Sequence, residues 1–420
     1  MIRKETLENG LTLLTESMPH VRSVSLGVWL RQGSRHEPAA LNGVSHFIEH
    51  LVFKGTENRN AREIALAVDS VGGQMDAFTS KEYTCFYAKV LDAHLPTAVD
   101  LLADIVRRPR FDPTELERER KVIVEEIRMV EDSPEELVYD LFSQHFYPRH
   151  PLGRPIQGTE ATVRGLSRRR LLSFFHGSYL PKNLLIVAAG NLEHDKLRRL
   201  IRGSFGSMEA GTMRRKKATR PRVRGGLVSR HKKELEQLHV LMGLPAYPEN
   251  FRDRYPLSVL NALLGGTMSS RLFQKIREER GLAYSVYSAV NAFLDTGLMM
   301  IYAATNPARG REVVRLVLDE LRDLRDHGPT KSELEVAKEH LKGSLMLSLE
   351  STASRMSNLA RQEMYYGRQF TLAEVLEGIE HVKPASVHRV AQQLFQNGTV
   401  TLAAVGRMDV SRLGREALRL

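Results

Sequence analysis

Two stretches of this 420-residue chain recur in the same order at nearly the same spacing. The segment LLIVAAGNLEHDKL at 184–197 is echoed by VTLAAVGRMDVSRL at 400–413, and PTELERERKVIVEEI at 113–127 is echoed by TKSELEVAKEHLKGSL at 330–345. Two matches at one offset of roughly 217 residues indicate a duplicated structural unit. We therefore expect two homologous halves, each with its own core.

Each half combines alternating strand-like segments with long amphipathic stretches, which predicts an α+β fold with helices covering one face of an antiparallel sheet. Residues 72–91, GGQMDAFTSKEYTCFYAKVL, predict two strands joined near Ser80. The segment 207–226 is rich in glycine and charge and has no regular period. We predict an N-terminal domain at 1–206, a basic linker at 207–226 and a C-terminal domain at 227–420.

The composition limits the compartment and the partners. The apolar runs are far shorter than a membrane span, and the N-terminus lacks an export signal, so we expect a cytoplasmic protein with no membrane partner. Cys85 is the only cysteine, so a metal would need His and carboxylate ligands. Much of the net charge of +11 lies in RRKKATRPRVR at 214–224, which has no aromatic residue for stacking on bases. We expect a solvated linker there and no nucleic-acid partner.

The apolar run VSHFIEHLVFKG at 44–55 contains two histidines and a glutamate. A helix over 44–54, ended by Gly55, places His46, Glu49 and His50 on one face. Imidazoles at i and i+4 can hold one Zn²⁺ and leave Glu49 beside the metal as a general base. Because zinc activates a water and polarises a carbonyl, the motif predicts hydrolysis of a peptide bond. The alternative is a chance triple on a half-exposed helix.

A second helix is predicted from about 113 to 131, with Asp112 as its N-cap and a proline in its first turn. Glu119 and Glu126 share one face of that helix, whereas Glu125 points about 100° away. We predict Glu126 as the third zinc ligand and Glu119 as a partner that orients a ligand or the substrate. The alternative is a charged surface helix.

At these residues the sequence resembles the His-x-x-Glu-His zinc peptidases, or inverzincins. It most resembles the pitrilysin-type (M16) peptidases of the short-chain subfamily that includes the mitochondrial processing peptidase β subunit and its bacterial homologues. The resemblance covers nearly the whole chain and is carried by HFIEHLVFKGT, GGQMDAFTSKEYT, VIVEEIRMVEDSP, HPLGRPIQGTE and GLAYSVYS. It implies one Zn²⁺ per chain on His46, His50 and Glu126, with Glu49 as the base and Glu119 beside the ligands.

The resemblance also implies residues that bind the substrate. Arg277 and Tyr284, seven residues apart in REERGLAY, would hold or polarise the substrate carbonyl. A peptide would pair as an added strand against residues 74–80, which include Asp76, Ala77 and Phe78. Many members have Asn where this chain has Asp76.

A further acidic pair, Glu136 and Asp140, lies at i and i+4 on the next predicted helix. A capping-box pattern at Ser133 predicts the start of that helix. In processing peptidases the matching carboxylates contact a substrate arginine. The alternative is that Glu136 only caps its helix and that Asp140 is solvated.

The resemblance implies two halves that close like a clam shell over unfolded peptides, and assembly as a homodimer or as a heterodimer with an inactive homologue. No His-x-x-Glu-His occurs in the second half, so one half would be catalytic. The main rival is a non-catalytic structural or partner subunit of the same fold, which the intact His46, Glu49, His50 and Glu126 disfavour. A nucleic-acid-binding protein would rest on the basic linker alone.

Overall fold

The computed structural model describes residues 1–211, 219–407 and 418–420. The chain forms two compact units, and each unit is assembled from separate stretches of sequence. The first contains Met1–Arg128, Arg154–Ala218 and Leu347–Gln369, and the second contains Met129–Gly153, Thr219–Met346 and Phe370–Leu420. Within the described ranges, no helix is both long and apolar enough to cross a membrane.

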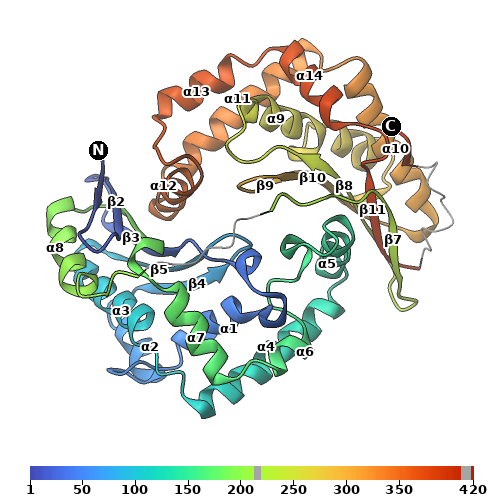
Figure 1. Ribbon diagram of the computed structural model, residues 1–420. Coiled ribbons are helices and arrows are strands. Elements are labelled where there is room, and N and C mark those ends of the chain that lie inside the picture. Colours follow the sequence, from blue (N-terminus) through green and yellow to red (C-terminus); the bar gives the residue numbers. More distant parts are fainter. Residues whose placement is uncertain (212–218, 408–417) are drawn as a thin grey trace. The chain divides into compact units, whose positions relative to one another are not determined.

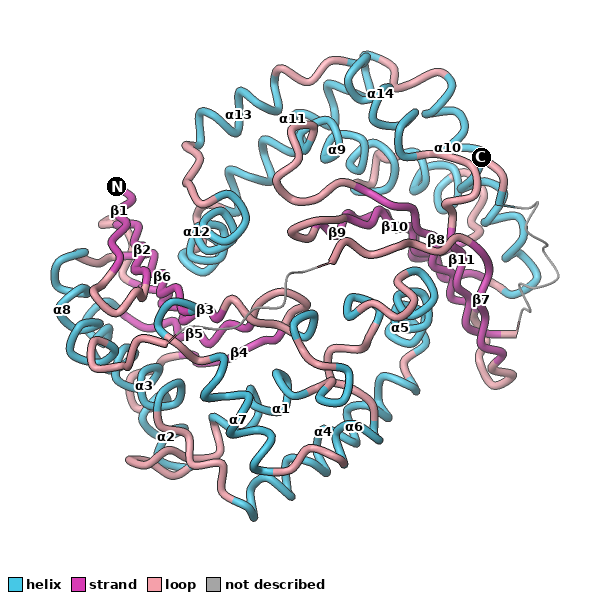
Figure 2. Tube along the Cα trace, in the orientation of Figure 1, coloured by secondary structure: helices cyan, strands magenta, loops and turns pink. Residues whose placement is uncertain are grey.

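The first unit contains a six-stranded sheet (Figure 1), and its strands follow the order β1-β2-β6-β3-β5-β4 (Figure 2). Neighbouring strands are antiparallel except for β2 and β6, which are parallel, so the sheet is mixed. The predicted hairpin at 72–91 is confirmed as β4 and β5. The strands are β1 (Ile2–Thr6), β2 (Thr12–Ser17), β3 (Ser23–Leu30), β4 (Gln74–Thr79), β5 (Thr84–Leu91) and β6 (Leu184–Gly190).

Helices α1, α3, α7 and α8 of the first unit gather on one face of its sheet (Figure 2). Alternate strand residues, such as Val28, Phe86 and Ile186, point into the core between the sheet and these helices. The helices are α1 (Val44–Val52), α2 (Ala61–Asp69), α3 (Leu95–Arg107), α4 (Pro113–Asp132), which continues into the second unit, α6 (Glu160–Arg164), α7 (Arg168–Ser178) and α8 (His194–Phe205).

The second unit repeats this plan with a sheet of order β7-β11-β8-β10-β9, in which β7 and β11 are the parallel pair. The α+β class and the organisation into two sheets covered by helices are therefore confirmed. Residues 408–413 of the second repeat lie outside the described residues. The elements are β7 (Gly226–His231), β8 (Leu238–Ala246), β9 (Ala283–Ala292), β10 (Gly297–Thr305), β11 (Thr401–Gly406), α9 (Arg254–Asn261), α10 (Gly310–Asp326), α11 (Lys331–Ser348), α13 (Leu372–Glu380), α14 (Pro384–Leu394) and π-helical turns at Ala262–Gly266 and Phe273–Glu278.

Each sheet is covered on its other face by a helix from the opposite half of the chain. Helix α12 (Thr352–Tyr366) packs on β2, β3 and β6, where Met356, Leu359 and Ala360 join Trp29 in a buried cluster. Helix α5 (Pro134–Phe146) packs on β8 and β11 through Phe142 and other apolar residues. The sequence predicted helices on one face only, whereas the structure buries both faces of each sheet.

The predicted linker at 207–226 lies between the last element of the first sheet and β7. Its residues 212–218 lie outside the described residues, so the domain boundaries drawn there stay a prediction.

Candidate metal centre

Helix α1 has one apolar and one polar face. Val44, Phe47, Ile48 and Leu51 are buried in the core of the first unit. His46, Glu49 and His50 are only half-buried and lie on the remaining face, as the helical period predicted.

The end of α1 differs from the prediction. The helix stops at Val52, and the Lys54 amide donates to the Leu51 carbonyl at 3.0 Å in a tighter final turn. Gly55, with φ of 130°, does not end the helix but forms a bridge with Asn60. The motif histidines lie before this difference and are unaffected by it.

Helix α4 begins and ends close to the predicted residues. Asp112 Oδ1 accepts the amides of Thr114 at 2.8 Å and Glu115 at 3.2 Å, so the predicted N-cap is confirmed. Glu126 is half-buried, whereas Glu125 is exposed and pairs with Arg128 at 2.7 Å. The helix therefore directs the two adjacent glutamates to different surroundings.

The structure brings His46, His50 and Glu126 together. Glu126 Oε2 lies 3.5 Å from His50 Nε2 and 3.7 Å from His46 Nε2, and one donor atom from each residue lies within 4.8 Å of the others. Two ligands at about 2.0–2.1 Å from a tetrahedral zinc ion are about 3.4 Å apart. The donor set and its spacing fit zinc, and no other such group of three occurs in the described part of the chain.

Glu119 holds the second nitrogen of His50. Its Oε2 lies 3.2 Å from His50 Nδ1, while its Oε1 lies 3.0 Å from Lys54 Nζ. Glu119 is only 5% exposed, so these contacts occur largely away from water. A carboxylate on Nδ1 fixes the orientation of the ring and leaves Nε2 free to bind a metal. Lys54 was not predicted from the sequence, because its contact depends on how α1 and α4 pack.

Glu49 accepts a hydrogen bond from the hydroxyl of Thr79 on β4. Burial raises the pKa of Glu49 above its usual value. Burial also lowers the pKa of His46 to about 4, with a further contribution from the charge of His50, so His46 is neutral near pH 7. A neutral imidazole is the form that binds metal. Thr79 is part of the quoted GGQMDAFTSKEYT motif, but only the packing of β4 against α1 gives it this role.

The residues predicted to pair with substrate lie on β4, at one end of the strand order. Ala77 shares the strand face of Thr79 and therefore of Glu49, whereas Asp76 and Phe78 point to the opposite face. Asp76 Oδ1 accepts the amide of Ala77 at 2.8 Å. The extra carboxylate therefore points away from the face of β4 that Glu49 contacts.

Arg277 and Tyr284 belong to the second unit and contact each other. The guanidinium carbon of Arg277 lies 4.6 Å from the centre of the Tyr284 ring and 4.7 Å from that of Phe273. Tyr284, on β9, is 79% exposed, so its hydroxyl is open to a ligand. The predicted pair is thus adjacent, and its role toward a substrate stays a prediction.

Glu136 and Asp140 also belong to the second unit, on α5. The helix begins at Pro134 as predicted, but the Ser133 side chain makes no capping hydrogen bond, so the predicted capping box is wrong. The proline in the first turn presets the helical φ, and the helix starts without that bond. Glu136 is exposed and Asp140 is half-buried.

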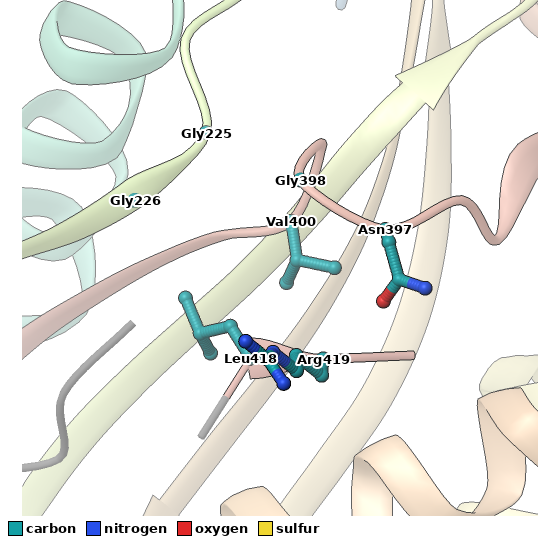
Figure 3. Close-up of a pocket in the computed structure, with 7 residues that line it drawn as sticks. All are labelled: Gly225, Gly226, Asn397, Gly398, Val400, Leu418 and Arg419. Atoms are coloured by element: carbon teal, nitrogen blue, oxygen red, sulfur yellow. The ribbon is translucent and has the colours of Figure 1, made fainter. Parts of the chain in front are cut away.

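A cavity of about 480 Å³ in the second unit contains none of the predicted site residues (Figure 3). It adjoins the C-terminal residues and is lined by Gly225, Gly226, Asn397, Gly398, Val400, Leu418 and Arg419.

The two-sheet α+β fold and the half-buried His-His-Glu cluster place the protein in the class of candidate zinc-dependent hydrolases. Residues 12–160 match the family described as insulinase (peptidase family M16), and residues 165–341 match the one described as the peptidase M16 inactive domain. The chain belongs to the M16 peptidase family.

Its relatives carry names that agree with this family. The chain is 44% identical to the uncharacterized zinc protease YmxG of Bacillus subtilis over 94% of its own length and 96% of that protein. It is also 44% identical to an uncharacterized zinc protease of Mycobacterium tuberculosis, over 94% of this chain and 90% of the relative. Zinc is thus part of the relatives' names.

Solved structures share the fold. A crystal structure of a protease from Helicobacter pylori aligns with a TM-score of 0.89 at 24% identity, covering 96% of this chain and 99% of that one. A peptidase M16 inactive domain from Pseudomonas fluorescens aligns with the same TM-score at 20% identity, covering 97% and 98%. At these identities the likeness shows the fold alone.

Proposed function

We propose that the protein is a zinc-dependent endopeptidase of the His-x-x-Glu-His type, with one Zn²⁺ held by His46, His50 and Glu126. The observation that carries the proposal is the convergence of these three donors beside a fourth ionisable group, Glu49, which contacts Thr79. A non-catalytic subunit of the same fold would have no need of this complete set.

Zinc, when bound, activates a water molecule and polarises the scissile carbonyl. Glu49 then takes a proton from the attacking water and delivers it to the leaving amide nitrogen. Glu49 can serve in both transfers because a carboxylate beside the metal ligands can accept the proton and return it. The Thr79 hydroxyl holds one carboxylate oxygen, which leaves the other oxygen free to accept the proton.

We propose that the substrate is an unfolded peptide that pairs with the outer edge of β4 at Asp76, Ala77 and Phe78. The support is the terminal position of β4 in the first sheet, because an edge strand presents unpaired backbone groups. Backbone pairing makes recognition broad with respect to side chains.

The remaining parts of the proposal rest on the family resemblance. Arg277 and Tyr284 act on the substrate carbonyl, and Glu136 and Asp140 bind a basic substrate side chain. The chain assembles as a homodimer or with an inactive homologue.

The test compares zinc content, by atomic absorption, with cleavage of a quenched peptide library. Glu49→Gln should retain zinc and lose nearly all cleavage, because the amide cannot accept the proton. His50→Ala should lose both zinc and cleavage. Glu125→Gln is the matched control on the exposed face of α4 and should behave as the native chain. Native-level cleavage by Glu49→Gln would reject Glu49 as the base, and stoichiometric zinc in His50→Ala would reject the ligand set.

A zinc-loaded native chain that cleaves no peptide in the library, alone or as its purified homodimer, would instead favour the non-catalytic subunit. That result separates the two functions because only the endopeptidase requires turnover.

A further inference from the structure

Helix α1 carries the proposed metal ligands but has no cap of its own. Its N-cap residue is Gly43, which has no side chain and adopts a left-handed φ of 95°. The surroundings are buried, so water cannot easily satisfy the free amides of the first turn. An amide left without an acceptor in such a place costs about 1–3 kcal/mol.

The missing cap is supplied by Glu37, which precedes the helix. Its Oε2 accepts the Gly43 amide and its Oε1 accepts the Ser45 amide, both at 2.8 Å. Oε2 also accepts the Asn42 side-chain amide at 3.1 Å. The carboxylate is charge-complementary to the helix N-terminus, and Glu37 is only 3% exposed.

The segment RPIQG at residues 154–158 also contacts the turn that precedes α1. Arg154 Nη2 donates to the Glu37 carbonyl at 3.1 Å, and Asn42 Nδ2 donates to the Pro155 carbonyl at 3.0 Å. A Cβ added at Gly43 would lie 2.5 Å from the Gln157 carbonyl oxygen, so the two backbones are in direct contact. This part of the HPLGRPIQGTE motif has no role in the chemistry proposed above.

These contacts hold the first turn of α1, which lies directly before the first proposed metal ligand, His46. Ser45 is adjacent to His46, and α1 has only nine residues, so a rotation of the first turn moves His46 relative to Glu126 on α4. Burying a carboxylate is costly, and burial raises the pKa of Glu37. Hydrogen bonds from Gly43, Ser45 and Asn42 oppose this shift.

We propose that Glu37 is a positioning residue, which fixes the first turn of α1 so that His46, Glu49 and His50 face Glu126. The proposal rests on the metal site proposed above, but not on peptidase activity. The test of this proposal therefore uses the metal ion alone, without a peptide substrate.

The experiment compares Glu37→Gln with Asn60→Ala in the full chain. Asn60 caps α2 in the same unit by accepting the Glu63 amide at 2.9 Å, and α2 carries no proposed ligand. Metal-free protein is titrated with zinc against a chromophoric chelator, and the visible spectrum of the cobalt-substituted protein reports the ligand geometry. Melting temperature is measured for both variants.

Glutamine keeps the size of Glu37 but turns one acceptor oxygen into a donor, so one of the two backbone amides loses its partner. Glu37→Gln should bind zinc roughly tenfold more weakly, the lower end of the effect expected for groups that orient ligands. Its cobalt spectrum should change. Asn60→Ala should lower the melting temperature and leave zinc affinity and the cobalt spectrum native. This separation is one that a purely structural role would not produce.

Native zinc affinity and a native cobalt spectrum in Glu37→Gln would overturn the proposal, as would an equal loss of affinity in Asn60→Ala. Should Glu37→Gln fail to fold, Asn42→Ala decides, because it removes one contact of the carboxylate and the link to Pro155. A few-fold loss of zinc affinity supports the proposal, and native affinity overturns it. A native chain that binds zinc without cleaving peptides would reject only the peptidase function.

Discussion

Leu359→Ala tests the finding that α12, from the second half of the chain, completes the core of the first sheet. Leu359 is 3% exposed and belongs to the cluster that contains Trp29. Its contacts lie on the face of the sheet opposite to α1. The substitution should therefore destabilise the first unit without touching the metal cluster.

The expected size follows from burial. Replacing a buried leucine by alanine costs about 2–5 kcal/mol, through lost transfer free energy and the cavity left behind. We expect about 3 kcal/mol, because α12 lies at the surface of the unit and can partly close the cavity. With an m-value of about 3 kcal/mol/M, the urea midpoint should fall by about 1 M.

The assay uses Trp29, the only tryptophan of the chain, which is 1% exposed beneath α12. Its fluorescence during urea unfolding reports the first unit alone. Leu347→Ala is the control, since Leu347 precedes α12 and is 71% exposed, and it should change stability by less than about 0.5 kcal/mol. Equal Trp29 transitions in Leu359→Ala and the native chain would refute the packing of α12 on this sheet.

Three further predictions concern the site. Glu126→Gln should lose zinc by atomic absorption while Glu125→Gln keeps it, and the reverse result would move the ligand by one position. Glu119→Gln should bind zinc about 10–100-fold more weakly, because His50 loses the carboxylate that contacts its Nδ1. Native zinc affinity, measured by competition with a chelator, would show that Glu119 does not orient His50. Arg277→Ala and Tyr284→Phe should keep native zinc content and lower peptide turnover. Unchanged turnover in both variants would show that these two residues do not act on the substrate.

Features that depend on neighbouring residues along one helix were predictable from the sequence. The period of 3.6 residues placed His46 and His50 on one face of α1 and separated Glu126 from Glu125 on α4. The Asp112 cap was also predictable, because its hydrogen bonds reach only two and three residues ahead. Local prediction also failed at one position, because the capping-box pattern at Ser133 occurs without the side-chain hydrogen bond that it predicts.

Which helices and strands contact one another depends on the packing of the folded chain. An amphipathic pattern shows that a helix has an apolar face, but it does not say which sheet that face covers. The packing of α5 and α12 on the sheet formed by the opposite half of the chain could therefore not be predicted from the pattern. The contacts of Thr79 with Glu49, of Lys54 with Glu119 and of Glu37 with the start of α1 join side chains to groups on other segments. Such contacts depend on the packing of whole elements, because their geometry is set by the shared core and not by spacing along the chain.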